Sequence, residues 1–127
     1  MTTVKLSKNL QNPRGVYSIP VTPFHEDGKL DLDSLRKCIE FCLEKGAHGI
    51  VMPVNASEVS TLTDEERTQV IKEGVKSVNG SVHFVAGVTG NSIEQVQESV
   101  KIVEDLGVDS IITCLLYTSD AADEVDG

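Results

Sequence analysis

The sequence predicts an α/β fold in which four short parallel strands alternate with three helices. Short runs rich in β-branched residues alternate with longer amphipathic segments, and the run at 48–54 is almost entirely apolar, as in a parallel strand covered on both faces. Gly46, Gly80 and Gly107 end the helical segments at the spacing of roughly 30 residues that βα units require. Either a small doubly wound sheet or the first half of a (β/α)8 barrel fits this pattern.

The first βα unit is predicted over residues 15–46. A strand at 15–21 leads into a turn-rich loop, and Asp31 or Asp33 then caps a helix. Gly46 ends this helix. Its buried stripe is predicted from four residues at three- and four-residue spacings, which are Leu35, Cys38, Ile39 and Cys42.

The next two units each begin their helix with a predicted capping box. After a strand at 48–54 and a polar loop at 55–58, Thr63 and Glu66 form the first box, and the helix runs to about Lys76. After a third strand at 82–87, Ser92 and Gln95 form the second box. Gly107 ends that helix, and residues 108–113 form the fourth strand.

The composition of the 127-residue chain excludes several classes of function. Its formal net charge of −9 repels nucleic acid phosphates and anionic lipid surfaces. No apolar run approaches the ~20 residues of a membrane span, and the N-terminus lacks the apolar stretch of a secretory signal. Three cysteines are too few for a disulfide framework. We therefore expect a cytoplasmic protein without a nucleic acid or membrane partner.

The last fourteen residues, 114–127, break the alternating pattern with four acidic residues and no basic one. The eleven residues from Cys114 to Glu124 resemble the translation of a transposon-type sequencing adapter. We therefore expect residues 1–113 to be the native segment, half of a barrel domain, and residues 114–127 to be an adapter-derived tail. The alternative is an ordinary acidic and disordered terminus.

Other groups of potential ligands give weak signals. Cys38 and Cys42 share a helical face with apolar residues, so core packing is favoured over metal binding. The segment Gly87–Gly90 follows a strand but lacks the full dinucleotide fingerprint. No zinc-binding spacing joins the three histidines, which are His25, His48 and His83. We expect no metal site and no nucleotide site.

Several blocks of the sequence match one known family in order and spacing. Residues 15–31 read GVYSIPVTPFHEDGKLD, residues 46–51 read GAHGIV, and residues 62–67 read LTDEER after the pair Ser57-Glu58. Residues 86–91 add AGVTGN. In these blocks the chain resembles the dihydrodipicolinate synthase and N-acetylneuraminate lyase family, and the resemblance extends over residues 15–113.

The resemblance implies a (β/α)8 barrel of pyruvate-dependent class I aldolases, of which this chain holds strands one to four. The parent is expected to be a homotetramer that acts on a small 2-oxo acid without a cofactor. In such enzymes a lysine amine condenses with the 2-oxo group of pyruvate or a related acid. That lysine lies on the family's sixth strand and a proton-relay tyrosine on the fifth, beyond this chain. Tyr117 lies in the predicted tail and is assigned no role.

The resemblance also implies part of a site for the substrate carboxylate after the second strand. The family loop usually reads Gly-Thr-Thr-Gly-Glu or Gly-Ser-Thr-Gly-Glu, whereas residues 54–58 read Val-Asn-Ala-Ser-Glu. The Asn55 side-chain amide and the backbone N–H groups of Ala56 and Ser57 remain as anion donors. A different acid or an altered geometry is consistent with these changes, and a plain polar connector is the alternative. Glu58 is expected to be structural.

None of the lysines is predicted to lie inside the barrel. An exposed lysine is mostly protonated at neutral pH and is a poor nucleophile, so we expect this chain to lack aldolase activity. A sugar-acid dehydratase or hydratase-aldolase of the same superfamily is one alternative for the parent. A non-catalytic four-stranded α/β binding module is another. The lysines considered are Lys5, Lys8, Lys29, Lys37, Lys45, Lys72, Lys76 and Lys101.

Overall fold

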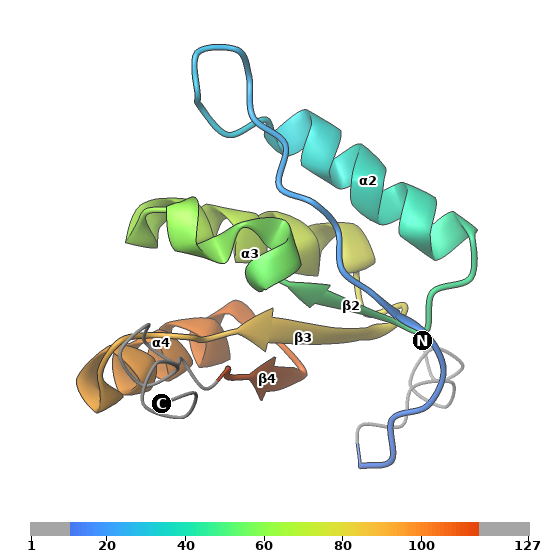
Figure 1. Ribbon diagram of the computed structural model, residues 1–127. Coiled ribbons are helices and arrows are strands. Elements are labelled where there is room, and N and C mark those ends of the chain that lie inside the picture. The colour runs from blue at the N-terminus through green and yellow to red at the C-terminus, as the bar shows by residue number, and fades with distance from the viewer. Residues whose placement is uncertain (1–10, 115–127) are drawn as a thin grey trace, which may run out of the picture.

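The computed structural model describes residues 11–114, in which four parallel strands form one sheet that packs against three α-helices (Figure 1). The strands are β1 (Tyr17–Ser18), β2 (Gly49–Met52), β3 (His83–Gly87) and β4 (Ser110–Ile112). The helices are α2 (Leu32–Glu44), α3 (Asp64–Val78) and α4 (Ile93–Leu106). Two short 3-10 turns, η1 (Asn55–Ser57) and η2 (Val59–Thr61), connect β2 to α3.

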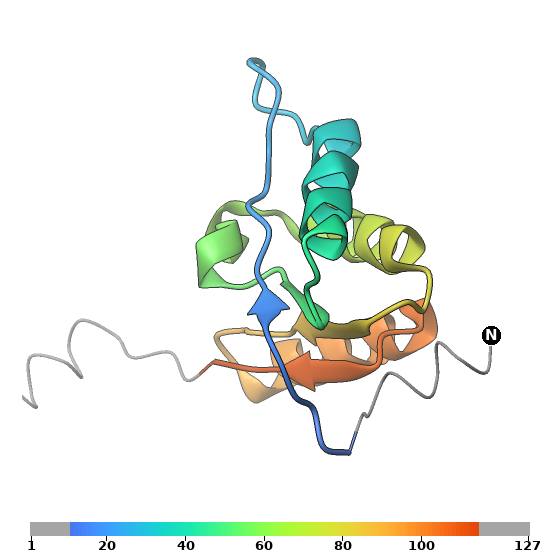
Figure 2. The same cartoon turned by 90° about the vertical axis from the view of Figure 1, so that its right-hand side faces the viewer.

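The strand order decides between the two predicted architectures. Neighbours in the sheet are neighbours in the sequence, in the order β1-β2-β3-β4, and every pair is parallel. A doubly wound sheet reverses its strand order and carries helices on both faces. Here α2 packs beside α3, α3 packs beside α4, and all three share one core with the sheet (Figure 2). The arrangement is that of consecutive units of a (β/α)8 barrel, so the half-barrel prediction is confirmed.

One apolar cluster fills the space between the helices and the sheet. Alternate residues of β2 and β3 point into it, because successive side chains of a strand point to opposite faces. Leu35 and Ile39 on α2 are fully buried there and Cys42 packs against the cluster, as predicted, whereas Cys38, the fourth residue of the predicted stripe, is half-buried and is not among the residues of this cluster. The strands, the other helices and the loops beside them contribute Ile50, Met52, Leu62, Val70, Ile71, Val78, Phe84, Ala86, Val88 and Val103.

The strands are shorter than the apolar runs that predicted them. Only Tyr17 and Ser18 of the run at 15–21 pair with β2. Pro20 cannot donate to a sheet ladder, and β2 likewise ends just before Pro53. The polar loop predicted at 55–58 is not irregular, since its first three residues form the turn η1.

The helix starts follow the local chemistry of their caps. The Oδ1 of Asp31 accepts from the Ser34 N–H at 3.0 Å, so Asp31 and not Asp33 caps α2. Both halves of the capping box at Thr63 and Glu66 are present, at 3.1 Å and 2.9 Å. This helix runs to Val78, two residues past the predicted end.

The second predicted capping box is wrong in one half. The Oγ of Ser92 accepts from the Gln95 N–H at 3.2 Å, as a cap should. The Oε1 of Gln95, however, accepts from the Asn91 N–H at 2.7 Å and so bonds the residue before the cap. The helix α4 therefore begins as predicted but with a different reciprocal bond.

Several sequence-based expectations fall outside the described residues. They concern Lys5, Lys8, Tyr117 and all of the predicted tail except Cys114. Within residues 11–114, no helix has the length and apolar character needed to cross a bilayer.

Candidate functional site

The three predicted carboxylate-binding residues form the turn η1, which follows the carboxyl end of β2. Carboxyl ends of parallel barrel strands are the edge at which barrel sites lie. Asn55 and Ala56 are exposed on this turn, whereas the side chain of Ser57 is fully buried. The structure thus brings Asn55 and Ala56 to the surface and directs Ser57 into the protein.

Two buried hydrogen bonds join this turn to the segment that follows β1. The Ser57 hydroxyl donates to the backbone carbonyl of Pro20 at 2.8 Å, and the Thr22 hydroxyl donates to the backbone carbonyl of Ser57 at 2.6 Å. Thr22 is itself buried, with 3% of its surface exposed. The Ser57 N–H donates to the carbonyl of Val54 at 2.9 Å. In this structure the polar groups of Ser57 therefore bond the protein.

Glu58 connects the two 3-10 turns through its backbone. Its φ of 61° lies in the left-handed region, which few non-glycine residues adopt. Its N–H donates to the Asn55 carbonyl at 2.9 Å, and its carbonyl accepts from both the N–H and the hydroxyl of Thr61. These contacts give Glu58 a structural part in the loop.

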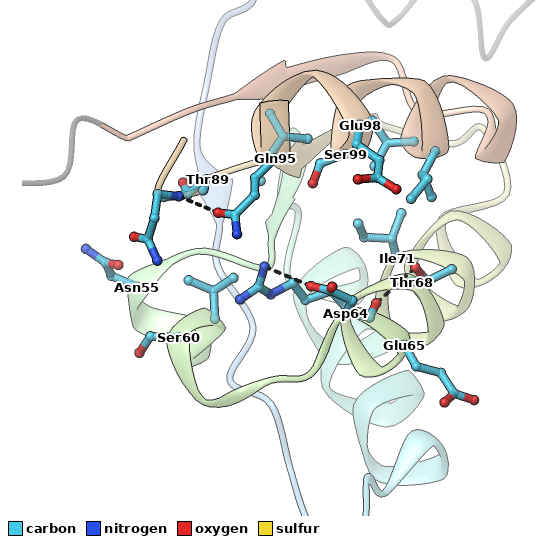
Figure 3. Close-up of a pocket in the computed structure, with 18 residues that line it drawn as sticks. Asn55, Ser60, Asp64, Glu65, Thr68, Ile71, Thr89, Gln95, Glu98 and Ser99 are labelled. Atoms are coloured by element: carbon cyan, nitrogen blue, oxygen red, sulfur yellow. Dashed lines mark hydrogen bonds and ion pairs between the residues drawn. The ribbon is translucent and has the colours of Figure 1, made fainter. Parts of the chain in front are cut away.

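A cleft of about 460 Å³ opens between α3 and α4 and extends to the loops after β2 and β3 (Figure 3). Figure 3 shows Asn55 and Thr89 at one end of this cleft and Thr68 and Ile71 at the other. Arg67 lines the cleft, with its Nη1 3.5 Å from the Asp64 carboxylate. The Arg67 Nε is buried without a hydrogen-bond partner among the described residues.

No sequence pattern predicted this cleft. Its lining residues come from two helices and from the loops after β2 and β3, and each polar residue among them reads on its own as a solvated helix position or loop residue. The polar residues that line it together with Asn55 are Ser60, Asp64, Glu65, Arg67, Thr68, Thr89, Asn91, Gln95, Glu98 and Ser99.

A partly buried polar chain crosses the opposite edge of the sheet, at the amino ends of the strands. The Tyr17 hydroxyl lies 2.5 Å from His83 Nδ1, and His83 Nε2 lies 2.7 Å from the Ser110 hydroxyl. A side chain at Gly49, on the strand between them, would place its Cβ 2.5 Å from the Tyr17 ring. Burial, and then the nearby Asp109 carboxylate, raise the pKa of Tyr17. Polar side chains at this end of a barrel serve stability more than catalysis.

The remaining candidates from the sequence stay apart from one another. His25 lies 3.7 Å from the Asp31 carboxylate, and His48 Nδ1 accepts from the Val16 N–H at 2.9 Å. No cluster of three or more histidine, cysteine or acidic side chains suited to a metal ion exists within residues 11–114. The lysines of the same range are all exposed on helices or loops, and these are Lys29, Lys37, Lys45, Lys72, Lys76 and Lys101.

Comparison with known proteins gives a consistent result. The model of the dihydrodipicolinate synthetase family matches residues 12–122. The 4-hydroxy-tetrahydrodipicolinate synthase of Cellvibrio japonicus is 42% identical over 98 residues, which are 77% of this chain and 33% of that protein. The enzyme of the same name from Methanococcus maripaludis is 39% identical over 104 residues, 82% of this chain and 36% of that protein.

Solved structures agree with the sequence comparisons. A chloride-inhibited dihydrodipicolinate synthase from Acinetobacter baumannii, crystallised with pyruvate, superposes with a TM-score of 0.81 at 36% identity, covering 84% of this chain and 37% of that one. The N-acetylneuraminate lyase of Mycoplasma synoviae gives a TM-score of 0.79 at 28% identity, covering 87% and 38%. The chain spans about a third of the length of the curated relatives it matches.

The family match also bears on the predicted boundary after Thr113. The matched range continues to residue 122 and so includes part of the segment expected to be an adapter-derived tail. The division into residues 1–113 and 114–127 stays a prediction.

Proposed function

Because this chain belongs to the dihydrodipicolinate synthetase family, we propose that its full-length parent is a Schiff-base lyase or synthase acting on pyruvate or a related 2-oxo acid. One observation carries the proposal. The exposed turn η1 lies at the carboxyl edge of the parallel sheet, where barrel enzymes bind their substrates. The pyruvate named for the Acinetobacter baumannii structure is a substrate of this class.

In the proposed site, Asn55 and Ala56 hold one end of the acid and Ser57 supports them. The side-chain amide of Asn55 and the backbone of Ala56 present donors to the carboxylate from the exposed side of η1. Ser57 supports the turn from beneath and does not bind the acid itself, because its hydroxyl donates to the Pro20 carbonyl and its N–H to the Val54 carbonyl. The charge of the carboxylate strengthens each hydrogen bond that it accepts.

We further propose that the 127-residue chain itself is inactive as an aldolase. Imine formation requires an unprotonated lysine amine that attacks the 2-oxo carbon and releases water. The lysines of residues 11–114 are exposed and lie on helices and loops, not on the strands of the sheet. An exposed lysine is mostly protonated at neutral pH.

Trapping with pyruvate and borohydride tests both parts of this proposal. The 127-residue chain is expected to show no covalent adduct by intact mass, whereas the full-length parent is expected to gain one reduced pyruvyl group on a single lysine. A stoichiometric adduct on one lysine of the short chain would overturn its inactivity. A parent that forms no adduct would overturn the Schiff-base chemistry.

The loop sequence favours a second candidate within the same superfamily, a sugar-acid dehydratase or hydratase-aldolase. Asn55 and Ala56 stand where the family usually carries two hydroxyl side chains, so the donors for the acid differ in shape and number. Product analysis of the parent separates the candidates: loss of water from a sugar acid supports the second, and condensation or cleavage at pyruvate supports the first.

Assembly and location belong to the same proposal. A homotetrameric parent follows from the family resemblance. A cytoplasmic location is supported by the cysteine content, since three cysteines are too few for the disulfide framework of a small secreted domain and a reducing compartment suits them.

A further inference from the structure

We propose that Thr22 and Ser57 are a positioning pair that holds the turn η1, and with it Asn55 and Ala56, in the geometry that binds the carboxylate. The proposal deepens the proposed function and rests on it. Neither residue is exposed enough to bind a ligand directly, since Thr22 is 3% exposed and Ser57 is fully buried. Thr22 and Ser57 instead hold in place the two residues that bind the ligand, Asn55 and Ala56.

The two hydrogen bonds of the pair run in opposite directions between the same two segments. Ser57 donates its hydroxyl to Pro20 at 2.8 Å, and two residues after Pro20 the Thr22 hydroxyl donates back to the Ser57 carbonyl at 2.6 Å. Both bonds are buried. A buried polar group that loses its partner costs about 1–3 kcal/mol, so neither bond can be broken without penalty.

The Pro20 carbonyl has no partner in the sheet ladder, so its bond from the Ser57 hydroxyl is important. The strand β1 ends at Ser18, so the sheet ladder does not continue as far as Pro20. The Pro20 residue is nevertheless buried, and a buried carbonyl requires a hydrogen-bond donor. The Ser57 hydroxyl meets that requirement and thereby anchors the turn after β2 to the chain after β1.

The turn has only short-range backbone bonds of its own. The amides of Ser57 and Val59 both donate to the Val54 carbonyl, at 2.9 Å and 3.2 Å, and the Glu58 amide donates to Asn55 at 2.9 Å. Such a three-residue 3-10 turn is a weak element. The hydroxyl bonds of Ser57 and Thr22 therefore add a link between this turn and the segment after β1 that the backbone bonds of the turn do not supply.

Amide hydrogen exchange on the 127-residue chain tests the anchoring directly. Ser57→Ala and Thr22→Val each remove one bond and are expected to speed exchange of the Ser57, Glu58 and Val59 amides about tenfold. Thr22→Ser keeps the hydroxyl and is expected to leave these rates unchanged. Ser81→Ala is the matched control, because it removes a hydroxyl-to-carbonyl bond of 2.6 Å at the end of α3.

The amides of β3 serve as the internal reference for global unfolding. Faster exchange confined to the turn supports the positioning pair. Unchanged rates at the turn overturn it, and so does an equal acceleration at the turn and in β3, which would mark a general loss of stability.

Titration with pyruvate, followed by the NMR shifts of the Asn55 side-chain amide and the Ala56 backbone amide, then tests positioning. Ser57→Ala is expected to raise the Kd about tenfold, while Ser81→Ala leaves it unchanged. Equal Kd values for wild type and Ser57→Ala would overturn the positioning role. If the wild-type chain shows no saturable shift, the carboxylate site of the proposed function fails in this chain, and the exchange rates alone decide whether the pair anchors the turn.

Discussion

At the residue scale, the clearest electrostatic effect belongs to Asp31, the cap of α2. The Ser34 hydroxyl donates to one carboxylate oxygen at 2.6 Å and the Ser34 N–H to the other at 3.0 Å. The hydroxyl bond, then the N–H bond and then His25 lower the pKa of Asp31 below its ordinary value of 3.8. A lowered folded-state pKa means that Asp31 stabilises the fold above the unfolded pKa and that this contribution is lost as the pH falls through the folded pKa.

Replacement of Ser34 tests this account. Ser34→Ala is expected to raise the pKa of Asp31 toward 3.8, because the largest cause of its lowering is removed. Ser34→Thr keeps the hydroxyl and is expected to hold the pKa low. NMR titration of the Asp31 carboxyl carbon measures the pKa directly. Urea unfolding should show Ser34→Ala less stable than wild type near neutral pH, and this difference should shrink as the pH falls through the folded-state pKa of Asp31. A difference that stays constant into acid would contradict the assignment.

Predictability at this scale depends on distance along the chain. Asp31 was one of two predicted caps because its partner is three residues away. The hydrogen bond between Tyr17 and His83 joins residues 66 positions apart, and no local sequence pattern predicts it. For the same reason Asn55 was a candidate from its loop position alone, while the burial of Ser57 against Pro20 required the folded chain.

At the element scale, the helix ends were predictable and the strand ends were not. A cap is decided by a few neighbouring residues, so the Thr63 box and the stop at Gly107, with its φ of 84°, are found where predicted. The length of a strand also depends on its pairing, and of the seven-residue run at 15–21 only Tyr17 and Ser18 pair with β2. The alternation of apolar residues within one segment does not show which other segment the strand will pair with.

The capping box of α3 offers a test at this scale. Thr63→Ala removes the acceptor of the Glu66 N–H and is expected to lower the free energy of unfolding by about 1 kcal/mol. Thr63→Ser retains the hydroxyl and should lose much less. The midpoint of urea unfolding measures both. Equal losses in the two variants would show that the threonine methyl group, and not the hydrogen bond, stabilises the helix start.

At the scale of the whole molecule, the outer strands define the open sides of the sheet. Within residues 11–114, β4 pairs only with β3, and β1 only with β2. Ile111 and Ile112 on β4 are 44% and 45% exposed. An open strand edge with exposed apolar side chains favours pairing with another chain.

The 127-residue chain is therefore expected to self-associate through β4. Ile111→Lys should reduce association, because it places a charge on the strand edge. Ile93→Lys is the matched control, since Ile93 is 73% exposed and lies on α4 and not on a strand. Sedimentation velocity measures the size distribution. A monomeric wild-type chain with sharp, dispersed NMR signals would contradict the expectation and favour a self-contained binding module.

The sequence predicted the fold class and the order of elements at this scale, but not every surface they form. Alternation of strands and helices left two architectures open, and the strand order, with α2, α3 and α4 on one core, decided between them. The cleft between α3 and α4 depends on how the two helices pack, with Arg67 from one and Gln95 from the other. The cleft forms only when the two helices pack side by side, so the sequence of α3 or of α4 alone does not predict it.

The simple strand order also has a consequence for how the chain folds. Tyr17 pairs with Gly49, Gly49 with His83, and Val85 with Ser110, so each pairing closes a loop of roughly 30 residues. Each of these strands pairs with the next one along the chain, so the sequence separation between paired strands is small. This keeps the contact order low for a parallel sheet. The units can therefore assemble in the order of synthesis, each new strand adding to the edge that the previous one has just formed.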